Sequence, residues 1–208
     1  MAEFWERSFQ DHRMMWGEDA ALSALFARDY FLEQGVHSVL IPGIGYGRNA
    51  RPFLDAGMSV SGIEISQTAI DLAKSTVGRD AIIYHGSVSD MPFDDRTYDG
   101  IFCYALIHLL DERDRAKLIR DCYAQLAHGG CMIFTAISTK SPTYGKGTPI
   151  GPQRYEQFGG VQIFFYDEAS MLHEFNNYGL VEIREIAEPS GKDHSTDMPF
   201  LAAVCRKT

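Results

Sequence analysis

The sequence lacks the features that mark several classes of protein. Its four cysteines stand singly and form no Cys-x-x-Cys pair, which argues against a zinc site or a disulfide framework. No apolar run approaches the roughly 20 residues that a membrane helix needs. The charged and aromatic start, MAEFWERSFQDHR, has no apolar core of the kind found in signal peptides. We therefore expect no membrane association and a cytoplasmic location.

Basic residues are scarcer than acidic ones. The chain has 19 Lys and Arg against 28 Asp and Glu, a formal net charge of −9. Contact with a long phosphate backbone would need a clustered basic face. We therefore expect a small-molecule substrate and no long nucleic acid. The length of 208 residues, of which 45% are hydrophobic, suits one domain with a full core, and the chain is expected to be a monomer or a weak homodimer.

Short apolar runs alternate with amphipathic stretches along most of the chain. The runs predict strands at 37–42, 58–64, 80–85, within 98–109, at 131–138, and near 180–186 and 198–205. Helical patterns stand between most of these strands. Such alternation predicts a mainly parallel sheet covered on both faces, with ligands at the carboxyl ends of its strands.

Polar and glycine residues mark the ends of the expected helices. Asn49, Ser66 and Asp111 are predicted to begin helices as cap residues, and HGG at 128–130 is predicted to end one. Residues 1–35 are expected to form a helical cap. The segment 139–166 is rich in Gly, Pro and polar residues and is too long for a plain connector. It is expected to be a loop or insertion that shapes a substrate pocket.

A glycine-rich turn, IPGIGYGRN at 41–49, follows the first expected strand. Glycine lets the backbone bend sharply and approach a ligand closely. The dinucleotide fingerprint G-x-G-x-x-G would need its third glycine at position 48, where the chain has Arg48. The spacing G-x-G-x-G therefore argues against a dinucleotide pyrophosphate, while a purely structural turn stays open.

Other strand ends also carry chemistry. Glu64 ends the second expected strand, where a carboxylate can accept the hydroxyls of an adenosine ribose. A capping or solvated charge is the alternative for this residue. The backbone of HGSVSDMPF, at 85–93, follows the third strand and could border an adenine. Tyr104 and His108 lie just past the fourth strand.

These segments together resemble the class I S-adenosylmethionine-dependent methyltransferases. The residues that carry the resemblance are VLIPGIGYGRNA, GIEIS, GSVSDMPF, YDGIFCYALIHLL and LAHGG. The P-G-x-G-x-G form and FWERSFQDHRMMWG are also similar to the thiopurine, thiol and halide enzymes, and GYGRNA to the tellurite-resistance enzymes. The resemblance implies a single α/β methyltransferase domain over 1–208. Its fold would be Rossmann-like and doubly wound, with a mostly parallel seven-stranded sheet, an antiparallel C-terminal strand and helices on both faces.

The resemblance also implies S-adenosylmethionine as cofactor and a role for each matching residue. The residues expected to bind the cofactor are Gly43, Ile44 and Gly45 (methionine and ribose), Glu64 (ribose hydroxyls), Ile65, Ser87 and Val88 (adenine), Cys103 (backbone to the methionyl amine), Arg48 and Asn49. The sequence departs from the family at Ile41, where an acidic residue is usual, and at Ser87, where Asp is usual.

Methyl transfer from a sulfonium is a direct in-line displacement, so a general base is needed only for a protonated acceptor. His108 is the leading candidate for that base, and it could equally be a core histidine. Tyr104 is a candidate aromatic wall. Arg48 could steer an anionic substrate or the cofactor carboxylate. Weaker candidates on the substrate side are His12, Tyr144, Arg154 and His194.

Several acceptors and activities can be weighed from motifs. The fourth strand is not followed by the Pro-Pro-aromatic motif of amino-methylating nucleic-acid enzymes. The chain also has no Pro-Cys dipeptide, which cytosine-5 methyltransferases need as their nucleophile. Asp and Asn residues do not cluster around any of the strand ends, so the sequence does not indicate a divalent-metal site. Methyl transfer to a small molecule is therefore the main hypothesis. An NAD-dependent oxidoreductase and a non-catalytic S-adenosylmethionine-binding module remain as alternatives.

Overall fold

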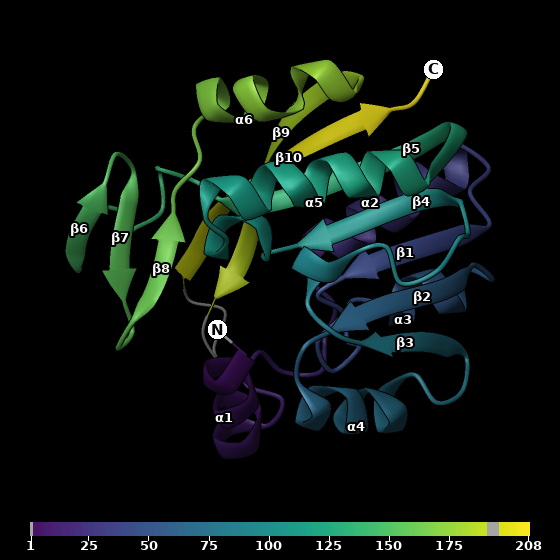
Figure 1. Ribbon diagram of the computed structural model, residues 1–208, viewed down its shortest axis with the longest axis horizontal. Helices are drawn as coiled ribbons and strands as arrows, with labels where there is room; N and C mark the ends of the chain where they lie inside the picture. The colour runs from purple at the N-terminus through teal and green to yellow at the C-terminus, as the bar shows by residue number, and fades with distance from the viewer. Residues whose placement is uncertain (1, 191–195) are drawn as a thin grey trace.

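The computed structural model describes residues 2–190 and 196–208, and its central feature is a seven-stranded sheet. The strand order is β3-β2-β1-β4-β5-β10-β9 (Figure 1). Neighbouring strands from β3 to β5 are parallel, and β10 is antiparallel to both β5 and β9. The strands are β1 Ser38–Pro42, β2 Ser59–Glu64, β3 Ala81–His85, β4 Tyr98–Tyr104, β5 Leu126–Ile137, β9 Leu180–Ser190 and β10 Thr196–Arg206. The predicted fold class is confirmed.

Helices cover both faces of this sheet. The described helices are α1 Ala2–His12, α2 Leu22–Glu33, α3 Arg51–Asp55, α4 Gln67–Thr76, α5 Glu112–Gln125 and α6 Glu168–Phe175, with short 3₁₀ turns η1 Val88–Asp90, η2 Ile107–Leu109 and η3 Asn176–Tyr178. One hydrophobic cluster joins the sheet to α5 and α6, and a second joins it to α2, α3 and α4. Burial on both faces explains why the strands read as nearly continuous apolar runs.

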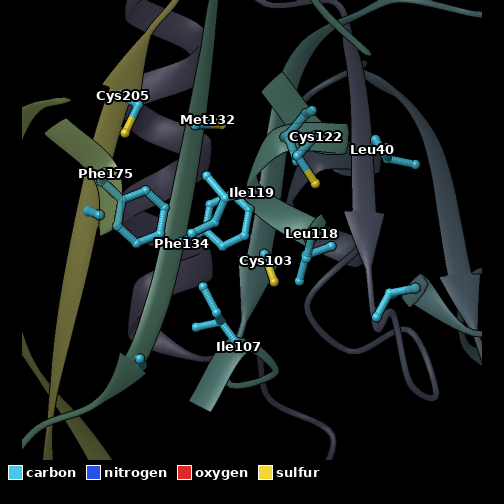
Figure 2. Close-up of a cluster of buried hydrophobic side chains, with 14 of the residues drawn as sticks. Leu40, Cys103, Ile107, Leu118, Ile119, Cys122, Met132, Phe134, Phe175 and Cys205 are labelled. Carbon is cyan, nitrogen blue, oxygen red and sulfur yellow. The ribbon is translucent and has the colours of Figure 1, made fainter. Parts of the chain in front are cut away.

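The cluster beneath α5 and α6 is built from alternate residues of the central strands. Phe134 of β5 packs against Phe175 of α6, with ring centroids 5.2 Å apart. Figure 2 shows the sulfur atoms of Cys103, Cys122 and Cys205 in the same cluster, pointing among apolar side chains. All four cysteines are free and buried. They act as small apolar core residues here, as their isolated positions in the sequence indicate.

Two of the three predicted helix caps are confirmed, and one is wrong. The Ser66 hydroxyl accepts the N–H of Ala69, and Asp111 caps α5 in the same way. Asn49 does not cap α3, which begins after Ala50 without a side-chain cap. Its amide oxygen instead accepts the N–H of Ala21, at 2.9 Å. Asn49 thus binds the N–H of the distant residue Ala21 in place of an N–H in the first turn of α3.

The prediction that HGG ends α5 is also wrong. The helix ends at Gln125, and residues 128–130 belong to β5. The ammonium group of Lys207 binds the helix end, donating to the carbonyls of Tyr123 and Leu126 at 2.7 and 2.8 Å. Because this cation satisfies the last carbonyls, the helix needs no glycine to stop.

The segment 139–166 folds into more than a loop. It contains a separate three-stranded antiparallel sheet, with β6 Thr148–Gly151, β7 Arg154–Gln157 and β8 Val161–Phe164. We call this the small sheet; in Figure 1 it lies beside the carboxyl end of the main sheet. Sequence reasoning located the insertion and missed its strands, which are short and rich in polar residues.

The N-terminal region is not one continuous helical cap. Residues 13–21 separate α1 from α2 and pass through Gly17, which has a positive φ of 77°. Across residues 2–190 and 196–208, no helix combines the length and the apolar character that crossing a membrane requires. In those same residues, no group of three or more His, Cys, Asp or Glu side chains is arranged to hold a metal ion.

Candidate functional site

The site lies where the direction of chain winding reverses. β1 stands between β2 and β4; the chain winds from β1 out to β3 and then crosses back to β4 and β5. In open α/β sheets, ligands bind beyond the carboxyl ends of the strands at such a point. The glycine turn follows β1, Glu64 ends β2 and Tyr104 ends β4. The topology therefore brings the three main sequence signals to one edge.

The glycine turn is tied to the second strand by backbone hydrogen bonds. The N–H groups of Gly43 and Ile44 both donate to the carbonyl of Ile63, at 2.8 and 3.1 Å. Ile44 packs so closely on Gly62 of β2 that a Cβ there would lie 2.5 Å from the Ile44 side chain. This contact leaves no room for a larger residue behind the turn.

The other two glycines of the turn have different surroundings. Gly45 and Gly47 have positive φ values of 57° and 85°. A Cβ on Gly47 would lie 2.9 Å from Val77 beyond α4, so this glycine permits close packing within the protein. A Cβ on Gly45 would meet only the Phe9 ring, at 4.0 Å. Gly45 is therefore the position at which a ligand could approach the backbone of the turn.

Glu64 has a buried carboxylate, 6% exposed, facing the glycine turn. One oxygen accepts the N–H of Gly45 and the other accepts the N–H groups of Ile65 and Ser66, all at 2.9 Å. Burial raises the pKa of this carboxyl, while the three N–H groups act in the opposite direction. A carboxylate offers about four acceptor positions, so about one remains for a ligand hydroxyl.

The residues expected around an adenine lie at the ends of β2 and β3. The carbonyl of Ile65 is 3.2 Å from the Nε2 of His85, and Ile65 itself is half-buried. The Ser87 hydroxyl accepts the N–H of Ser89 and caps η1. Val88 is buried beside it. The Ser87 side chain is thus engaged in its own turn.

The turn after β4 closes the site from the other side. Cys103 is fully buried, and burial raises the pKa of its thiol, so the thiol itself is inert. Ala105 has a positive φ of 52°, a conformation that residues other than glycine rarely adopt. Leu106 then packs on Gly43, where a Cβ would lie 3.0 Å from the leucine side chain. The turns after β1 and β4 are therefore in direct contact.

Tyr104 is held in an aromatic stack. Its ring is nearly parallel to that of Phe200, with centroids 5.7 Å apart, and the Arg48 guanidinium lies 5.7 Å from the Tyr104 centroid. Burial raises the pKa of the Tyr104 phenol, which therefore stays protonated. Arg48 also donates to the carbonyl of Asp19, at 2.8 Å. In this structure its guanidinium binds the protein's own backbone.

His108 lies in η2 and is 7% exposed. Its Nδ1 accepts the N–H of Ile137, at 3.3 Å, and its ring meets the edge of Phe200 at a centroid distance of 6.0 Å. Burial lowers the pKa of His108 to about 3. A ring with this pKa is a weak proton acceptor, which speaks against the role of general base.

The segment before α2 runs alongside the glycine turn. We define residues 2–21 as the N-terminal arm. The Tyr46 hydroxyl donates to Gly17, Arg48 to Asp19, and the Ala21 N–H to Asn49, at 2.7, 2.8 and 2.9 Å. The predicted cofactor residues Arg48 and Asn49 thus hold the arm.

Helix α1 of the arm is docked by Glu6 and an aromatic cluster. The Glu6 carboxylate accepts the hydroxyls of Thr68 and Ser66, at 2.6 and 2.7 Å, which holds its pKa at about 2. Trp16 stacks on Tyr46 with centroids 6.2 Å apart, and Phe9 meets both rings edge-on. These contacts place the arm over the glycine turn.

Glu188 of β9 fixes the start of α2, directly after the arm, and sequence reasoning missed it. It is 3% exposed, and its two oxygens accept the N–H groups of Leu22 and Ser23 at 2.9 and 2.8 Å. A carboxylate at a helix N-terminus is favourable, since it satisfies free donors and complements the helix dipole. Its partners lie about 165 residues away, so no local sequence pattern could have identified it.

The weaker candidates are dispersed. His12 ends α1 and is exposed. Tyr144 packs edge-on against Tyr155 and Phe165 at the small sheet. Arg154 of β7 donates to the carbonyl of Leu110, at 3.0 Å. His194 lies outside the described residues.

Comparison with known proteins identifies a methyltransferase domain. Residues 39–130 match the family model described as a methyltransferase domain. An uncharacterised methyltransferase of Bacillus licheniformis is 30% identical over 64% of this chain and 63% of its own length. The tRNA N(3)-cytidine methyltransferase METTL2 of Danio rerio is 24% identical over 88% of this chain and 55% of its own. The chain thus spans less than two thirds of these curated relatives.

Comparison with solved structures also finds methyltransferases. The 1,6-didemethyltoxoflavin-N1-methyltransferase of Burkholderia thailandensis superposes with a TM-score of 0.76 and is 17% identical. The match covers 100% of this chain and 87% of that one. The predicted resemblance to methyltransferases is confirmed: residues 39–130 match the domain model, and the chain shares the fold of the Burkholderia enzyme.

Proposed function

We propose that this chain transfers a methyl group from S-adenosylmethionine to a small-molecule acceptor. The methyltransferase domain and its fold support the cofactor, and the Burkholderia neighbour was solved with S-adenosylhomocysteine bound. Within the fold, the glycine turn and Glu64 offer the chemistry that an adenosine ribose requires. The NAD-dependent oxidoreductase stays disfavoured, because Arg48 replaces the third glycine of the dinucleotide fingerprint.

The observation that carries this proposal is the pairing of Glu64 with Gly45. The carboxylate is buried at the end of β2 and accepts the N–H of Gly45, the one glycine of the turn at which a Cβ would meet nothing closer than 4.0 Å. A ribose hydroxyl placed against Gly45 would therefore meet an ionisable acceptor already held in position. The residues present fit the cofactor at this point.

When bound, S-adenosylmethionine supplies the methyl group on a positively charged sulfonium. The chain's own contribution is to orient the two reactants, which can be worth on the order of 7–11 kcal/mol. Gly43, Ile44 and Gly45 would fix the donor, with Ile65, Ser87, Val88 and Cys103 as its further expected contacts. The arm and the small sheet flank the carboxyl edge and would enclose the acceptor. Arg48 and Asn49 would act on the cofactor indirectly, by holding the arm.

A small molecule is favoured over RNA as the acceptor. One relative is named as a tRNA methyltransferase, so RNA must be considered. The net charge of −9 opposes an extended phosphate contact. Arg48, a candidate for steering an anion, and Arg154, a weaker candidate on the substrate side, both donate to backbone carbonyls. A transfer assay with tRNA is a necessary arm of the acceptor screen.

Calorimetry with S-adenosylmethionine, S-adenosylhomocysteine and NAD tests the cofactor. We expect both sulfur compounds to bind and NAD to show no heat. Glu64→Ala should weaken binding about 10- to 100-fold, because a hydrogen bond to a charged group is worth about 1.5–3 kcal/mol. Glu156→Ala, at an exposed carboxylate on β7, is the matched control. Binding of NAD alone would refute the proposal.

Glu64 also supports the fold, so affinity must be separated from stability. Glu64→Gln keeps an acceptor for part of the N–H set and should fold better than Glu64→Ala. Thermal melts of each variant without ligand identify any loss of structure. A methyl-release screen with small amines, thiols, halides, carboxylates and heteroaromatic compounds then distinguishes an enzyme from a non-catalytic binding module.

A further inference from the structure

We propose that His108 recognises the methyl acceptor as a hydrogen-bond donor, through Nε2, and that the acceptor is a flat heteroaromatic molecule presenting a lone pair to it. This inference rests on the proposed function and names the substrate class of the same site. It assigns His108 to recognition, in place of the proton transfer expected from the sequence.

The first step is the tautomer of the ring. Nδ1 accepts the backbone N–H of Ile137, so this nitrogen carries no proton. In a neutral imidazole the proton must then lie on Nε2. The lone pair of Nδ1 is occupied by the backbone and Nε2 has none to offer, which leaves the ring no free site for a substrate proton. His108 can donate and cannot act as a base in this arrangement.

The second step is the unsatisfied donor. His108 is 7% exposed, and its only hydrogen bond within the described parts of the chain is the one made by Nδ1. Among the described residues, Nε2 of His108 is not one of the side-chain atoms that are fully buried without a partner, so this donor reaches the surface and a ligand can meet it there. Burial also lowers the pKa of the ring, which keeps it neutral. A lone pair on a ligand would satisfy the group.

The third step is the surroundings of the ring. Phe200 contacts His108 edge-on and stacks on Tyr104. Phe200 belongs to a cluster in which the main sheet, the small sheet and the arm meet; its other members and neighbours are Leu109, Ile137, Ile163, Phe165, Trp5, Ala105, Tyr155, Val161 and Met198. None of these side chains carries a formal charge, and with Phe200 included four members of the cluster are aromatic.

An apolar cluster with this aromatic content favours contact with a flat, uncharged ring system, since aromatic rings stack face to face or edge to face with one another. The cluster also includes Ala105, directly after β4, which places it next to the turn that contacts Gly43. The hydrogen bond from His108 would then orient the acceptor ring through one atom, while another atom of the same molecule receives the methyl group.

Two substitutions at His108 separate the possible roles. In His108→Gln the side-chain NH₂ occupies roughly the place of Nε2 and keeps a donor there. In His108→Asn the amide oxygen occupies roughly the place of Nδ1, so the Ile137 bond is kept and the donor is lost. Neither side chain can take up a proton near neutral pH.

Quinoline and indole are the probes, titrated into the full chain loaded with S-adenosylhomocysteine at pH 8. The two molecules are similar in size, but only quinoline presents a ring-nitrogen lone pair. We expect the wild type to bind quinoline about tenfold more tightly than indole, in line with one net hydrogen bond. His108→Gln should keep most of that preference, and His108→Asn should lose it.

Equal binding of both probes to the wild type would overturn the inference, as would an undiminished preference in His108→Asn. The ¹⁵N shifts of the wild-type ring give a test that needs no variant: the inference requires a protonated Nε2, and a protonated Nδ1 contradicts it. Failure of the proposed function has a different signature, which is absence of S-adenosylhomocysteine binding. The probe preference can then still be measured on the unloaded chain.

Discussion

The carboxylates on the two sides of the site have partners at very different distances along the chain. On the cofactor side, Glu64 is held by backbone N–H groups of Gly45, Ile65 and Ser66, which lie within 19 residues of it. The region where α5 and α6 meet the small sheet lies on what we propose to be the acceptor side; there Glu174 of α6 pairs with Arg115 of α5, 59 residues away, at 2.9 Å, and Arg115 lies over the Phe164 ring of β8. The first kind of contact comes with the βαβ unit itself, whereas the second depends on two particular side chains.

This difference indicates which amino-acid substitutions each side of the site tolerates. Every residue except proline has a backbone N–H, so the cofactor side tolerates most sequence changes as long as its glycines and its carboxylate remain. The acceptor side is fixed by side chains that can be exchanged one at a time. We therefore expect the cofactor side to fail at glycine substitutions and the acceptor side to fail at polar ones. Four predictions follow this contrast, from the largest effect to the smallest.

The Arg115–Glu174 pair gives the largest expected effect. Both side chains are mostly buried, at 7% and 15% exposure, and Arg115 also lies 4.3 Å from the Phe164 ring centroid. Arg115→Met leaves a buried carboxylate without its cation, which should cost about 3–5 kcal/mol of unfolding free energy. Urea denaturation measures this loss. Arg184→Met, at the exposed pair with Glu182, is the control and should cost under about 1 kcal/mol.

A double substitution tests the cause. Arg115→Met combined with Glu174→Leu removes both charges and should recover much of the lost stability. Recovery shows that the unpaired charge caused the loss. If the double variant loses as much unfolding free energy as the two single variants together, packing rather than charge stabilises the acceptor side.

Gly62→Ala tests the cofactor side. A Cβ at this position would lie 2.5–2.8 Å from atoms of Ile44 behind the glycine turn. We expect a loss of about 1–3 kcal/mol from overpacking, together with weaker S-adenosylhomocysteine binding. Gly151→Ala on the small sheet is the matched control, because its Cβ would meet nothing closer than 3.9 Å. Equal melting temperatures for the two variants would remove the distinction between the sides.

Tyr46→Phe tests the connection between the sides. It removes the hydroxyl that donates to Gly17 and leaves the Trp16 stack in place. We expect a loss of about 0.5–1.5 kcal/mol, localised to the arm. Hydrogen exchange should quicken at 17–21 and stay unchanged in β4 and β5. Faster exchange throughout the sheet would show that the arm is an integral part of the core.

Acidification should loosen the arm by a smaller amount. The pKa of Glu6 is about 2 against an ordinary value of 4.5. A lowered pKa means that this contribution to stability is complete above about pH 4.5 and disappears as the pH falls toward 2. Both tryptophans, Trp5 and Trp16, lie on the arm, so their fluorescence reports its position. It should stay constant from pH 7 to 5 and change below that.

Glu6→Gln is the control for this titration. The amide cannot ionise, so the part of the fluorescence change that comes from Glu6 should vanish, while changes from other carboxyls persist. Identical curves for the wild type and the variant would show that Glu6 does not dock the arm.

The same contrast explains how much could be predicted from the sequence. The strand order follows from hydrophobic runs and βαβ winding, and the caps Ser66 and Asp111 act on residues three positions away. Glu64 was found because its partners are local, although its role toward the cofactor stays a prediction. Asn49 and the HGG turn were misread because distant groups, the N–H of Ala21 and the ammonium of Lys207, replaced the local partners.

The missed residues have one property in common. Glu188 and Arg115 act through partners on other elements, and the strands of the small sheet bury few of their residues, so periodicity is weak. Such contacts exist only once the chain has folded. His108 was located correctly at the end of β4, but its protonation could not be predicted, since burial and the Ile137 bond set it.

The position of β10 between β5 and β9 bears on folding and aggregation. In the described sheet β5 and β9 do not pair with each other; each of them pairs with β10. Before β10 is inserted, β5 presents an open and strongly apolar edge, the kind of template on which chains add to one another. Closing that edge requires contacts over a long sequence separation, which slows folding. We expect substitutions that weaken β10, such as Ala203→Asp, to appear first as aggregation during synthesis, before any loss of cofactor binding in the protein that does fold.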